Sequence, residues 1–278
     1  MLSGELVRAR SHSALGRVAV ASGLVVVIAV VMGFLLVPIV ALVTYQPPGR
    51  LIDELGSSVT TQAIVVSLKT NAAAMLLTLA LGTPLAYAIG RHRFRGRRLV
   101  ITLIELPLVM PPAVAGIALL VAFGRLGLLG HVLGVLGIDI AFTPTAVVMA
   151  IVFVASPFYI RGAIGAFESV DATLLDVAGT LGAGPLRRMA RVALPLARVG
   201  LGASAALAFA RGIGEFGATI LFAGSFPGTT QTLPLAVYSL FDSNLDQAVA
   251  VGVLLLAVAG AILLTAKLFW PWPGSSST

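Results

Sequence analysis

The stretch DVAGTLGAGPLRRMARVALP, residues 176–195, interrupts a very apolar chain with three glycines and three arginines. Leu174, Ala178 and Leu181 recur at helical spacing behind a candidate N-cap at Asp171. Gly182 and Gly184 are typical of a helix end, and Pro185 suits the first turn of another helix. The pattern therefore predicts two short helices joined by a tight turn.

The second short helix would place its three arginines on a polar face, opposite Leu186, Met189 and Val192. Apolar runs long enough to cross a bilayer lie on both sides of this segment. A helical hairpin at a membrane surface, with an apolar knob and a basic rim, is shaped to dock into a groove on a soluble partner. An ordinary solvated loop is the alternative interpretation.

The composition indicates a polytopic membrane protein. The 278 residues are 58% hydrophobic and only 10% charged, which is too apolar for a soluble globular chain. Cysteine is absent, so disulfide and thiol chemistry are excluded. The net charge of +7 does not indicate nucleic-acid binding, because the basic residues flank apolar runs.

The apolar runs predict an all-α integral membrane protein with six transmembrane helices. The first run is too long for the core of a cleavable signal peptide, so we interpret it as a membrane span. We expect an N-terminal segment (1–17), spans at about 18–45, 63–90, 99–123, 143–160, 199–223 and 248–269, a transmembrane core over 63–269 with its polar loop at 161–198, and a short tail (270–278).

The distribution of basic residues predicts the sidedness. With six spans, the proposed cytoplasmic segments hold fourteen Lys and Arg residues and the proposed external loops hold two. The cluster RHRFRGRR, residues 91–98, lies on the cytoplasmic side in this arrangement. Since Lys and Arg are enriched in cytoplasmic loops, both termini are expected on the cytoplasmic side of the cytoplasmic membrane.

Four ionisable residues lie within the predicted spans. Arg211 and Glu215 are four positions apart and share a helix face, which allows an ion pair inside the membrane. This pair could simply lock the helix bundle, or it could border a transport path close to Gly217. Lys69 and Glu105 are expected near helix ends.

Prolines crowd the third predicted span in the stretch LPLVMPP, so this helix must bend or break near Pro111 and Pro112. A broken membrane helix offers free backbone groups and a helix N-terminus that could meet an anion. A packed kink is the alternative. The candidate residues for a translocation path or gate are Arg211, Glu215, Gly217, Thr219, Pro111 and Pro112.

Motifs for chemistry on this chain are missing. The sequence holds no G-x-x-x-x-G-K-[ST] phosphate loop, no H-E-x-x-H zinc motif and no G-x-S-x-G serine elbow. We therefore expect no catalytic residue, no metal and no cofactor bound by this chain. Any ATP must be used by a partner subunit.

The stretch at 176–195 resembles the signature loop of ABC-importer permeases. That pattern is Glu-Ala-Ala, three residues, Gly, nine residues, Ile, one residue and Leu-Pro, and it is matched here by Asp176, Val177 and Ala178, then Gly182, Val192, Leu194 and Pro195. Pro185 lies inside the same loop. Asp, Val and Val replace the Glu, the first Ala and the Ile of the pattern. The resemblance implies a type I ABC importer fold whose loop plugs into an ATP-hydrolysing subunit.

A narrower resemblance joins the blocks LPLVMPPAVAG (106–116), SPFYIRGAIGAFESVD (156–171), ARGIGEFGATILFAG (210–224) and TQTLPLAVYSLF (230–241). Together they look like the molybdate branch of the molybdate and sulfate permeases. This branch implies a homodimer of permeases, two cytoplasmic ATPase subunits and an extracytoplasmic oxyanion-binding protein. A sulfate, thiosulfate or tungstate permease, a passive six-span channel and a structural scaffold remain the alternatives.

Overall fold

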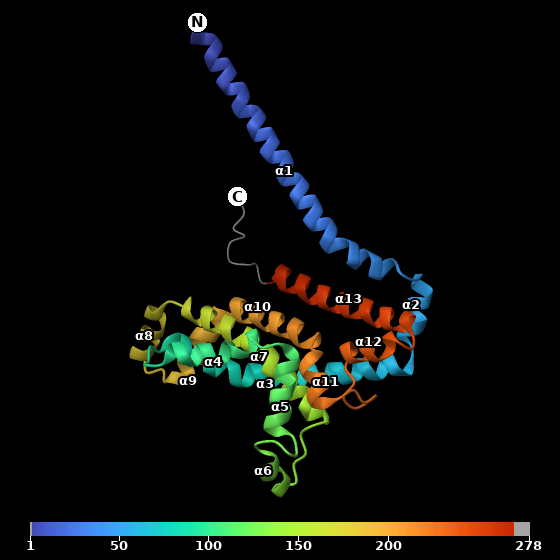
Figure 1. The fold of residues 1–278 in the computed structure, drawn as a ribbon. Helices are drawn as coiled ribbons and strands as arrows, with labels where there is room; N and C mark the ends of the chain where they lie inside the picture. The colour runs from blue at the N-terminus through green and yellow to red at the C-terminus, as the bar shows by residue number, and fades with distance from the viewer. Residues whose placement is uncertain (1, 270–278) are drawn as a thin grey trace. The chain divides into compact units, whose positions relative to one another are not determined.

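The computed structural model describes residues 2–269, with the side chains of residues 22–265 and Leu268, and every regular element within these residues is a helix (Figure 1). The chain divides between Arg50 and Leu51 into two compact units. The first unit consists mainly of α1 (Leu2–Thr44), whose segment Ser22–Thr44 is long and apolar enough to cross a membrane. It overlaps the span expected at 18–45.

The second unit is a bundle of long helices joined by shorter ones. After α2 (Pro48–Leu55), the helices are α3 (Ser58–Arg91), α4 (Arg97–Val109), α5 (Pro112–Phe123), α6 (Gly130–Val135), α7 (Pro144–Glu168), α8 (Ala172–Thr180), α9 (Pro185–Arg188), the π-helix η1 (Met189–Ala193), α10 (Leu194–Ile213), α11 (Gly217–Ala223), α12 (Leu233–Phe241) and α13 (Leu245–Phe269).

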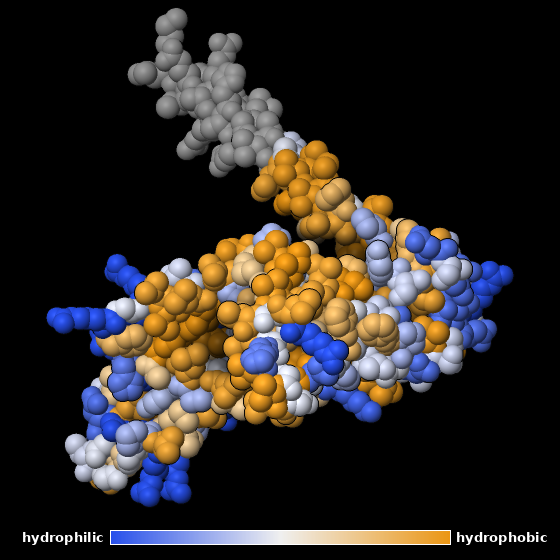
Figure 2. Space-filling model, turned by 60° about the horizontal axis from the view of Figure 1, so that its bottom comes forward, coloured by the Kyte–Doolittle hydropathy of each residue, from blue (hydrophilic) through white to orange (hydrophobic). Residues whose placement is uncertain are grey.

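Within the described residues, five helices are long and apolar enough to cross a membrane, and α4 with α5 makes a sixth if the pair counts as one span. The two members of this pair meet at 113°. The predicted break at Pro111 and Pro112 is thus confirmed. Figure 2 shows broad hydrophobic areas on the face drawn, with hydrophilic residues gathered mainly toward two opposite ends.

Helix α7 lies at the centre of the second unit, where it packs against α3 and α10 and also touches α4, α5 and α11. Its buried face is rich in alanine, which lets neighbouring backbones approach closely. At one such contact, a Cβ added to Gly82 of α3 would lie 3.0 Å from the ring of Tyr159. The Tyr159 hydroxyl also hydrogen-bonds Thr83 at 2.6 Å, so α3 and α7 are joined by both packing and a polar contact.

Two spans differ from the boundaries expected from sequence. The fourth, expected at 143–160, continues as α7 to Glu168, because the residues after Ile160 remain mostly apolar and several are fully buried. The fifth, expected at 199–223, belongs to a helix that starts at Pro185 and ends at Ile213. The chain then breaks around Gly214 before α11 begins.

The π-helical turn η1 has a local cause. Pro195 has no N–H, so it cannot donate to the carbonyl four residues earlier. The N–H of Leu194 instead reaches back to the carbonyl of Met189, five residues away. This wider turn lets α9 and α10 run on as one continuous element through a proline.

We call the end of the second unit that carries the α3–α4 turn and the α8–α9 hairpin the arginine end. These segments lie far apart in sequence and close together in space (Figure 1). The opposite end carries the start of α3 and the α12–α13 junction, joined by the contact of Gln247 with Thr60 at 3.2 Å.

Candidate functional site

The α8–α9 hairpin occupies the segment where two short helices and a tight turn were predicted, and both helices are present. Asp171 caps α8, since its carboxylate accepts a hydrogen bond from the Thr173 N–H at 2.9 Å. The backbone and hydroxyl hydrogen bonds of Thr173, with a smaller contribution from the charge of Arg91, hold the pKa of the Asp171 carboxyl below its usual value. The cap is therefore anionic at neutral pH.

Gly182 closes the turn after α8 in a left-handed backbone conformation, with φ at +80°. The N–H of Ala183 reaches back to the carbonyl of Ala178 at 3.0 Å. This geometry is a common helix stop, and glycine adopts it without the strain that a Cβ would bring. Sequence spacing predicted the helix end, and the structure adds the conformational reason for the glycine.

An apolar ridge runs along the outside of the hairpin. Leu174, Val177 and Leu181 follow one another on one face of α8, and each is about half exposed or more. Leu186 of α9 is also mostly exposed, whereas Leu175 is buried and anchors α8 to the bundle. This exposed apolar ridge is a candidate contact surface for a partner.

The hairpin is compact because a side chain of α9 packs over a glycine of α8. A Cβ added to Gly179 would lie 3.3 Å from Nη1 of Arg188. Arg187 and Arg191 are exposed, so they form the predicted basic rim. Beyond the rim, Val192 lies in η1, and the pair Leu194–Pro195 begins α10.

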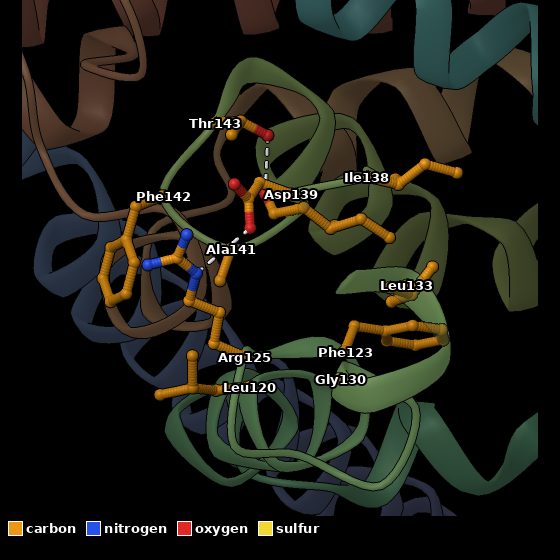
Figure 3. A pocket seen from close by; sticks show the side chains of 11 residues that line it. Leu120, Phe123, Arg125, Gly130, Leu133, Ile138, Asp139, Ala141, Phe142 and Thr143 are labelled. Carbon is orange, nitrogen blue, oxygen red and sulfur yellow. Dashed lines mark hydrogen bonds and ion pairs between the residues drawn. The ribbon is translucent and has the colours of Figure 1, made fainter. Parts of the chain in front are cut away.

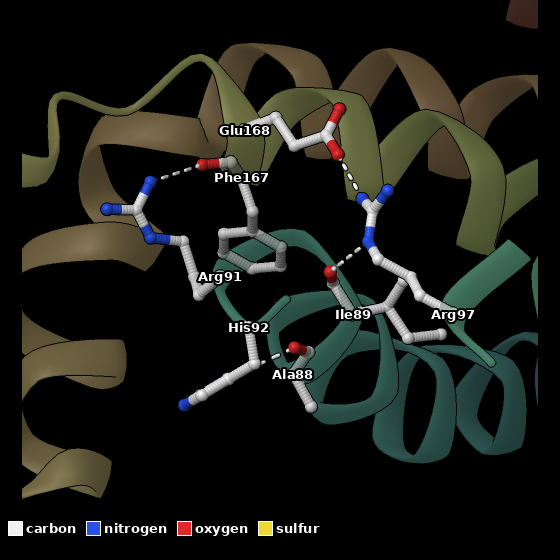
Figure 4. Close-up of polar contacts among 7 residues, drawn as sticks. All are labelled: Ala88, Ile89, Arg91, His92, Arg97, Phe167 and Glu168. Carbon is white, nitrogen blue, oxygen red and sulfur yellow. Dashed lines mark hydrogen bonds and ion pairs between the residues drawn. The ribbon is translucent and has the colours of Figure 1, made fainter. Parts of the chain in front are cut away.

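Two arginines at the α3–α4 turn bind the end of α7, just before the hairpin begins (Figure 4). Arg91 donates from Nη1 to the carbonyl of Val170 at 2.8 Å and to that of Phe167 at 3.3 Å. Arg97 donates to the carbonyl of Ile89 at 3.0 Å and forms an ion pair with Glu168. Sequence analysis used this arginine cluster only for sidedness and missed its role at the end of α7.

The second candidate region lies where α10 ends and α11 begins. Nη1 of Arg211 and Oε2 of Glu215 form an ion pair at 2.7 Å, as the spacing predicted. Oε1 of Glu215 also accepts from the N–H of Ala218 at 2.8 Å, at the start of α11. The Glu215 side chain is 1% exposed, while that of Arg211 is 29% exposed. Glu215 is therefore fixed from two directions, and the guanidinium of Arg211 keeps open surface.

The proline break meets this region directly. A Cβ added to Gly217 would lie 2.6 Å from Cβ of Pro112, at the first residue of α5. One turn further along, a Cβ added to Gly116 would lie 2.7 Å from the carbonyl oxygen of Ala218. The structure thus brings together Pro112 and Gly217, which sequence analysis selected for unrelated reasons.

Buried polar groups lie in α11 and around the start of α12. Thr219 is fully buried, and its hydroxyl has no hydrogen-bond partner among the described residues. Leu233 lies in the TQTLPLA block, and its N–H donates to Oγ of Ser67 in α3 at 2.8 Å, so Ser67 caps α12. Nε2 of Gln231 donates to Oγ of Ser239 at 2.8 Å. Sequence analysis did not assign Ser67, and only its position within a predicted span marked it.

A second ion pair within the bundle joins Glu105 of α4 to Arg161 of α7. Sequence analysis expected Glu105 near a helix end. It placed Arg161 in the cytoplasmic loop because it ended the fourth span too early. The apolar run on both sides of Arg161 was the signal available for this residue. Lys69, also expected near a helix end, is exposed on α3.

A pocket of about 420 Å³ lies among α5, α6 and the segment before α7 (Figure 3). Nε of Arg125 and Oδ1 of Asp139 approach to 3.3 Å over it, and both side chains are mostly exposed. The walls are otherwise mainly apolar, with Phe123 and Phe142 among them. An exposed pair of this kind adds little stability.

Comparison with known proteins gives the family to which this chain belongs. Residues 82–267 match the family of binding-protein-dependent transport system inner membrane components, and the chain belongs to this family. With its membrane-length helices, it is a multi-pass protein of the inner membrane. Homologues in this family are transport permease subunits.

Curated relatives share much of the sequence. The chain is 48% identical over 202 residues to the molybdenum transport system permease protein ModB of Mycobacterium tuberculosis, which covers 73% of this chain and 76% of that protein. It is 38% identical over 203 residues to the Escherichia coli K12 protein of the same name, with 73% and 89% covered. A probable molybdenum ABC transporter permease of Haloferax volcanii is 39% identical over 246 residues, with 87% and 88% covered.

Solved structures support the fold. The chain is similar to a bacterial ABC transporter involved in alginate import, with a TM-score of 0.70, 18% identity, and 93% of this chain and 97% of that chain covered. It is also similar to the MetNI methionine ABC transporter, with a TM-score of 0.59, 18% identity, and 76% and 94% covered. The expected fold class, an all-α type I ABC importer permease, is confirmed.

Proposed function

We propose that this chain is the pore-forming permease subunit of an ATP-driven importer for a tetrahedral oxyanion, with molybdate as its substrate. The observation that carries the proposal is 48% identity over 202 residues to a molybdenum transport permease. The sequence block around Arg211 and Glu215 and the block TQTLPLA belong to the same resemblance. A passive channel is at odds with membership of a binding-protein-dependent family.

The partners follow from the same proposal. Two copies of a cytoplasmic ATP-binding subunit dock on a homodimer of this chain, and an extracytoplasmic binding protein delivers the oxyanion. This chain binds no cofactor, and ATP is used by the partner subunit. Both chain termini face the cytoplasm, so the arginine end is the cytoplasmic end, in keeping with its basic residues.

The α8–α9 hairpin is the coupling element in this proposal. Its apolar ridge of Leu174, Val177 and Leu181 supplies buried contact area, and the exposed arginines beside it supply a basic rim. The hairpin leads without a break into α10, which ends beside Arg211. A displacement of the hairpin by ATP-driven closure of the partner subunits would therefore reach the ion pair.

The translocation path runs past the open side of Arg211. Glu215 holds the guanidinium in place and caps α11, while Gly217 and Pro112 let α11 and α5 approach. The hydroxyl of Thr219 adds a hydrogen-bonding group, and Pro111 ends the turn from which α5 begins. A path for an anion needs donors of this kind without a deep trap.

Uptake of labelled molybdate tests the proposal. We expect proteoliposomes that hold this chain and its ATPase to accumulate molybdate only with ATP and the binding protein. Excess unlabelled sulfate should not compete. Uptake abolished by excess sulfate would instead assign a general sulfate-type permease. A preference for tungstate would be seen when tungstate competes directly with labelled molybdate. Uptake without ATP would refute the ATP-driven importer.

Docking of the hairpin is tested by Gly182→Asp. The change adds a negative charge and a side chain at a position with φ +80°. Both the turn after α8 and the proposed contact of the hairpin with the ATPase would be disturbed. We expect ATP-dependent uptake and capture of the ATPase to be lost while membrane insertion persists. The matched control is Gly134→Asp in α6, where an added Cβ meets nothing within 4 Å. Normal uptake by Gly182→Asp would contradict the docking assignment.

A further inference from the structure

A groove of about 740 Å³ lies between α4, α7 and α10. Its walls carry small residues, among them Gly162, Gly165, Gly200 and Ser204. A Cβ added to Gly162 would lie 2.1 Å from Oγ of Ser204, so α7 and α10 touch at this level. Small residues let the two helices approach closely, and the groove lies beside their seam.

Arg161 lines this groove, and its side chain is 64% exposed. It lies seven residues before the end of α7 at Glu168, about 10 Å inside the helix end at 1.5 Å per residue. Arginines at such positions almost always face the bundle interior or a water-filled cavity, because a guanidinium in hydrocarbon is costly. A groove that faces water in the assembled transporter would leave this exposed guanidinium available to a solute.

Glu105 of α4 is the partner of Arg161, with its side chain 29% exposed. The arrangement repeats that of Arg211 and Glu215, in which the carboxylate is the more buried member. Each arginine thus keeps donor groups open while a carboxylate holds it.

The face of α10 that lines the groove leads to Arg211. On α10, Gly200, Ser204, Leu207 and Arg211 recur at spacings of four, three and four, so they share a helix face. Since Gly162 is level with Ser204, Arg161 lies about 10 Å along the helix from Arg211, toward the arginine end. An anion that leaves Arg211 toward the arginine end would therefore pass the level of Arg161.

We propose that Arg161 is a second oxyanion-binding group, which receives the anion from Arg211 in the half of the path nearer the arginine end, and that Glu105 is its resting counterion. The inference rests on the proposed function. A guanidinium offers several N–H donors that suit a tetrahedral oxyanion. The carboxylate competes with the anion for these donors, so the ion is bound weakly enough to leave.

The test compares Arg161→Gln, Glu105→Gln and the double variant Glu105→Leu/Arg161→Leu in proteoliposomes with the ATPase and the binding protein. The measured quantities are the rate of labelled molybdate uptake, its KM and the ATPase activity stimulated by the binding protein. Arg125→Gln is the matched control, because it removes one guanidinium from an exposed ion pair outside the bundle.

We expect Arg161→Gln to lower uptake about tenfold or more, as loss of a charge-assisted hydrogen bond predicts, while stimulated ATPase activity stays near that of the unchanged protein. Glu105→Gln should lower both KM and the maximal rate, because the anion then binds more tightly and leaves more slowly. The double leucine variant should transport as poorly as Arg161→Gln.

Three outcomes would overturn the inference. In the first, Arg161→Gln takes up molybdate as fast as Arg125→Gln. In the second, Glu105→Gln and Arg161→Gln lose uptake to the same extent and lose assembly to the same extent. In the third, the double leucine variant takes up molybdate normally. The last two would identify the pair as a structural lock. Failure of the unchanged protein to take up molybdate, tungstate or sulfate would instead refute the proposed function.

Discussion

Replacing Gly217 with alanine probes the contact between the proline break and the start of α11. The added Cβ would lie 2.6 Å from Cβ of Pro112 and 3.3 Å from the backbone nitrogen of Ala113. Carbon atoms pack best at about 3.5–4.0 Å, so the two helix ends must separate by about 1 Å. Pro112 is held in the first turn of α5, and its ring has little freedom to move aside.

Overpacking of this kind costs about 1–3 kcal/mol of folding free energy. We expect Gly217→Ala to lower the apparent midpoint of thermal unfolding in detergent and to reduce ATP-dependent uptake of molybdate. We expect a larger relative loss of uptake than of stability, because the separation of α5 and α11 displaces the start of α11. Glu215 caps this end of α11 beside Arg211.

The control is Gly260→Ala in α13, where an added Cβ meets nothing within 4 Å. Glycine is about 0.5–1 kcal/mol less favourable than alanine within a helix, so this variant should be neutral or slightly more stable. The measurements are thermal unfolding followed by circular dichroism and uptake into proteoliposomes. If Gly217→Ala matched Gly260→Ala in both, the α5–α11 contact would have no role in transport.

Three further predictions concern the contacts that set the hairpin and α12 in place. Arg91→Gln should lose two bonds to backbone carbonyls and reduce the coupling of ATP hydrolysis to uptake, whereas the exposed Arg93→Gln should not. The pKa of Asp171 is lowered from 3.8, so its carboxylate fully caps α8 above pH 3.8, and the cap is lost only as the pH falls through the lower folded-state pKa. Hydrogen exchange at the Thr173 amide should therefore stay slow at neutral pH. Ser67→Ala should cost about 1–3 kcal/mol in thermal unfolding, because it leaves a buried N–H at the start of α12 without its partner.

Sequence reasoning recovered the features that depend on local chemistry. The helix stop at Gly182, the start of α9 at Pro185 and the ion pair between Arg211 and Glu215 each follow from spacing within a single segment. The break at Pro111 follows from the missing N–H of proline. These features need no knowledge of how distant helices pack.

The features that sequence reasoning missed depend on contacts between distant segments. Arg91 meets Val170 across 79 positions, and Ser67 meets Leu233 across 166. Arg161 was misplaced because hydropathy alone ended the span just before it, while burial against α3 and α10 carries α7 further. Periodicity within one helix reports which face is apolar, but not which neighbour supplies the polar partner.

One continuous element connects the two candidate regions. From Pro185 to Ile213, α9, η1 and α10 span 29 residues, about 40 Å at the rise of an α-helix. The hairpin lies at one end of this element, and Arg211 lies in the last turn at the other. Because η1 carries the helix through Pro195 without a break, a shift of the hairpin would reach Arg211 along one continuous helix. Insertion of a glycine pair at this turn should therefore uncouple ATP hydrolysis from uptake while leaving both the docking ridge and the ion pair in place.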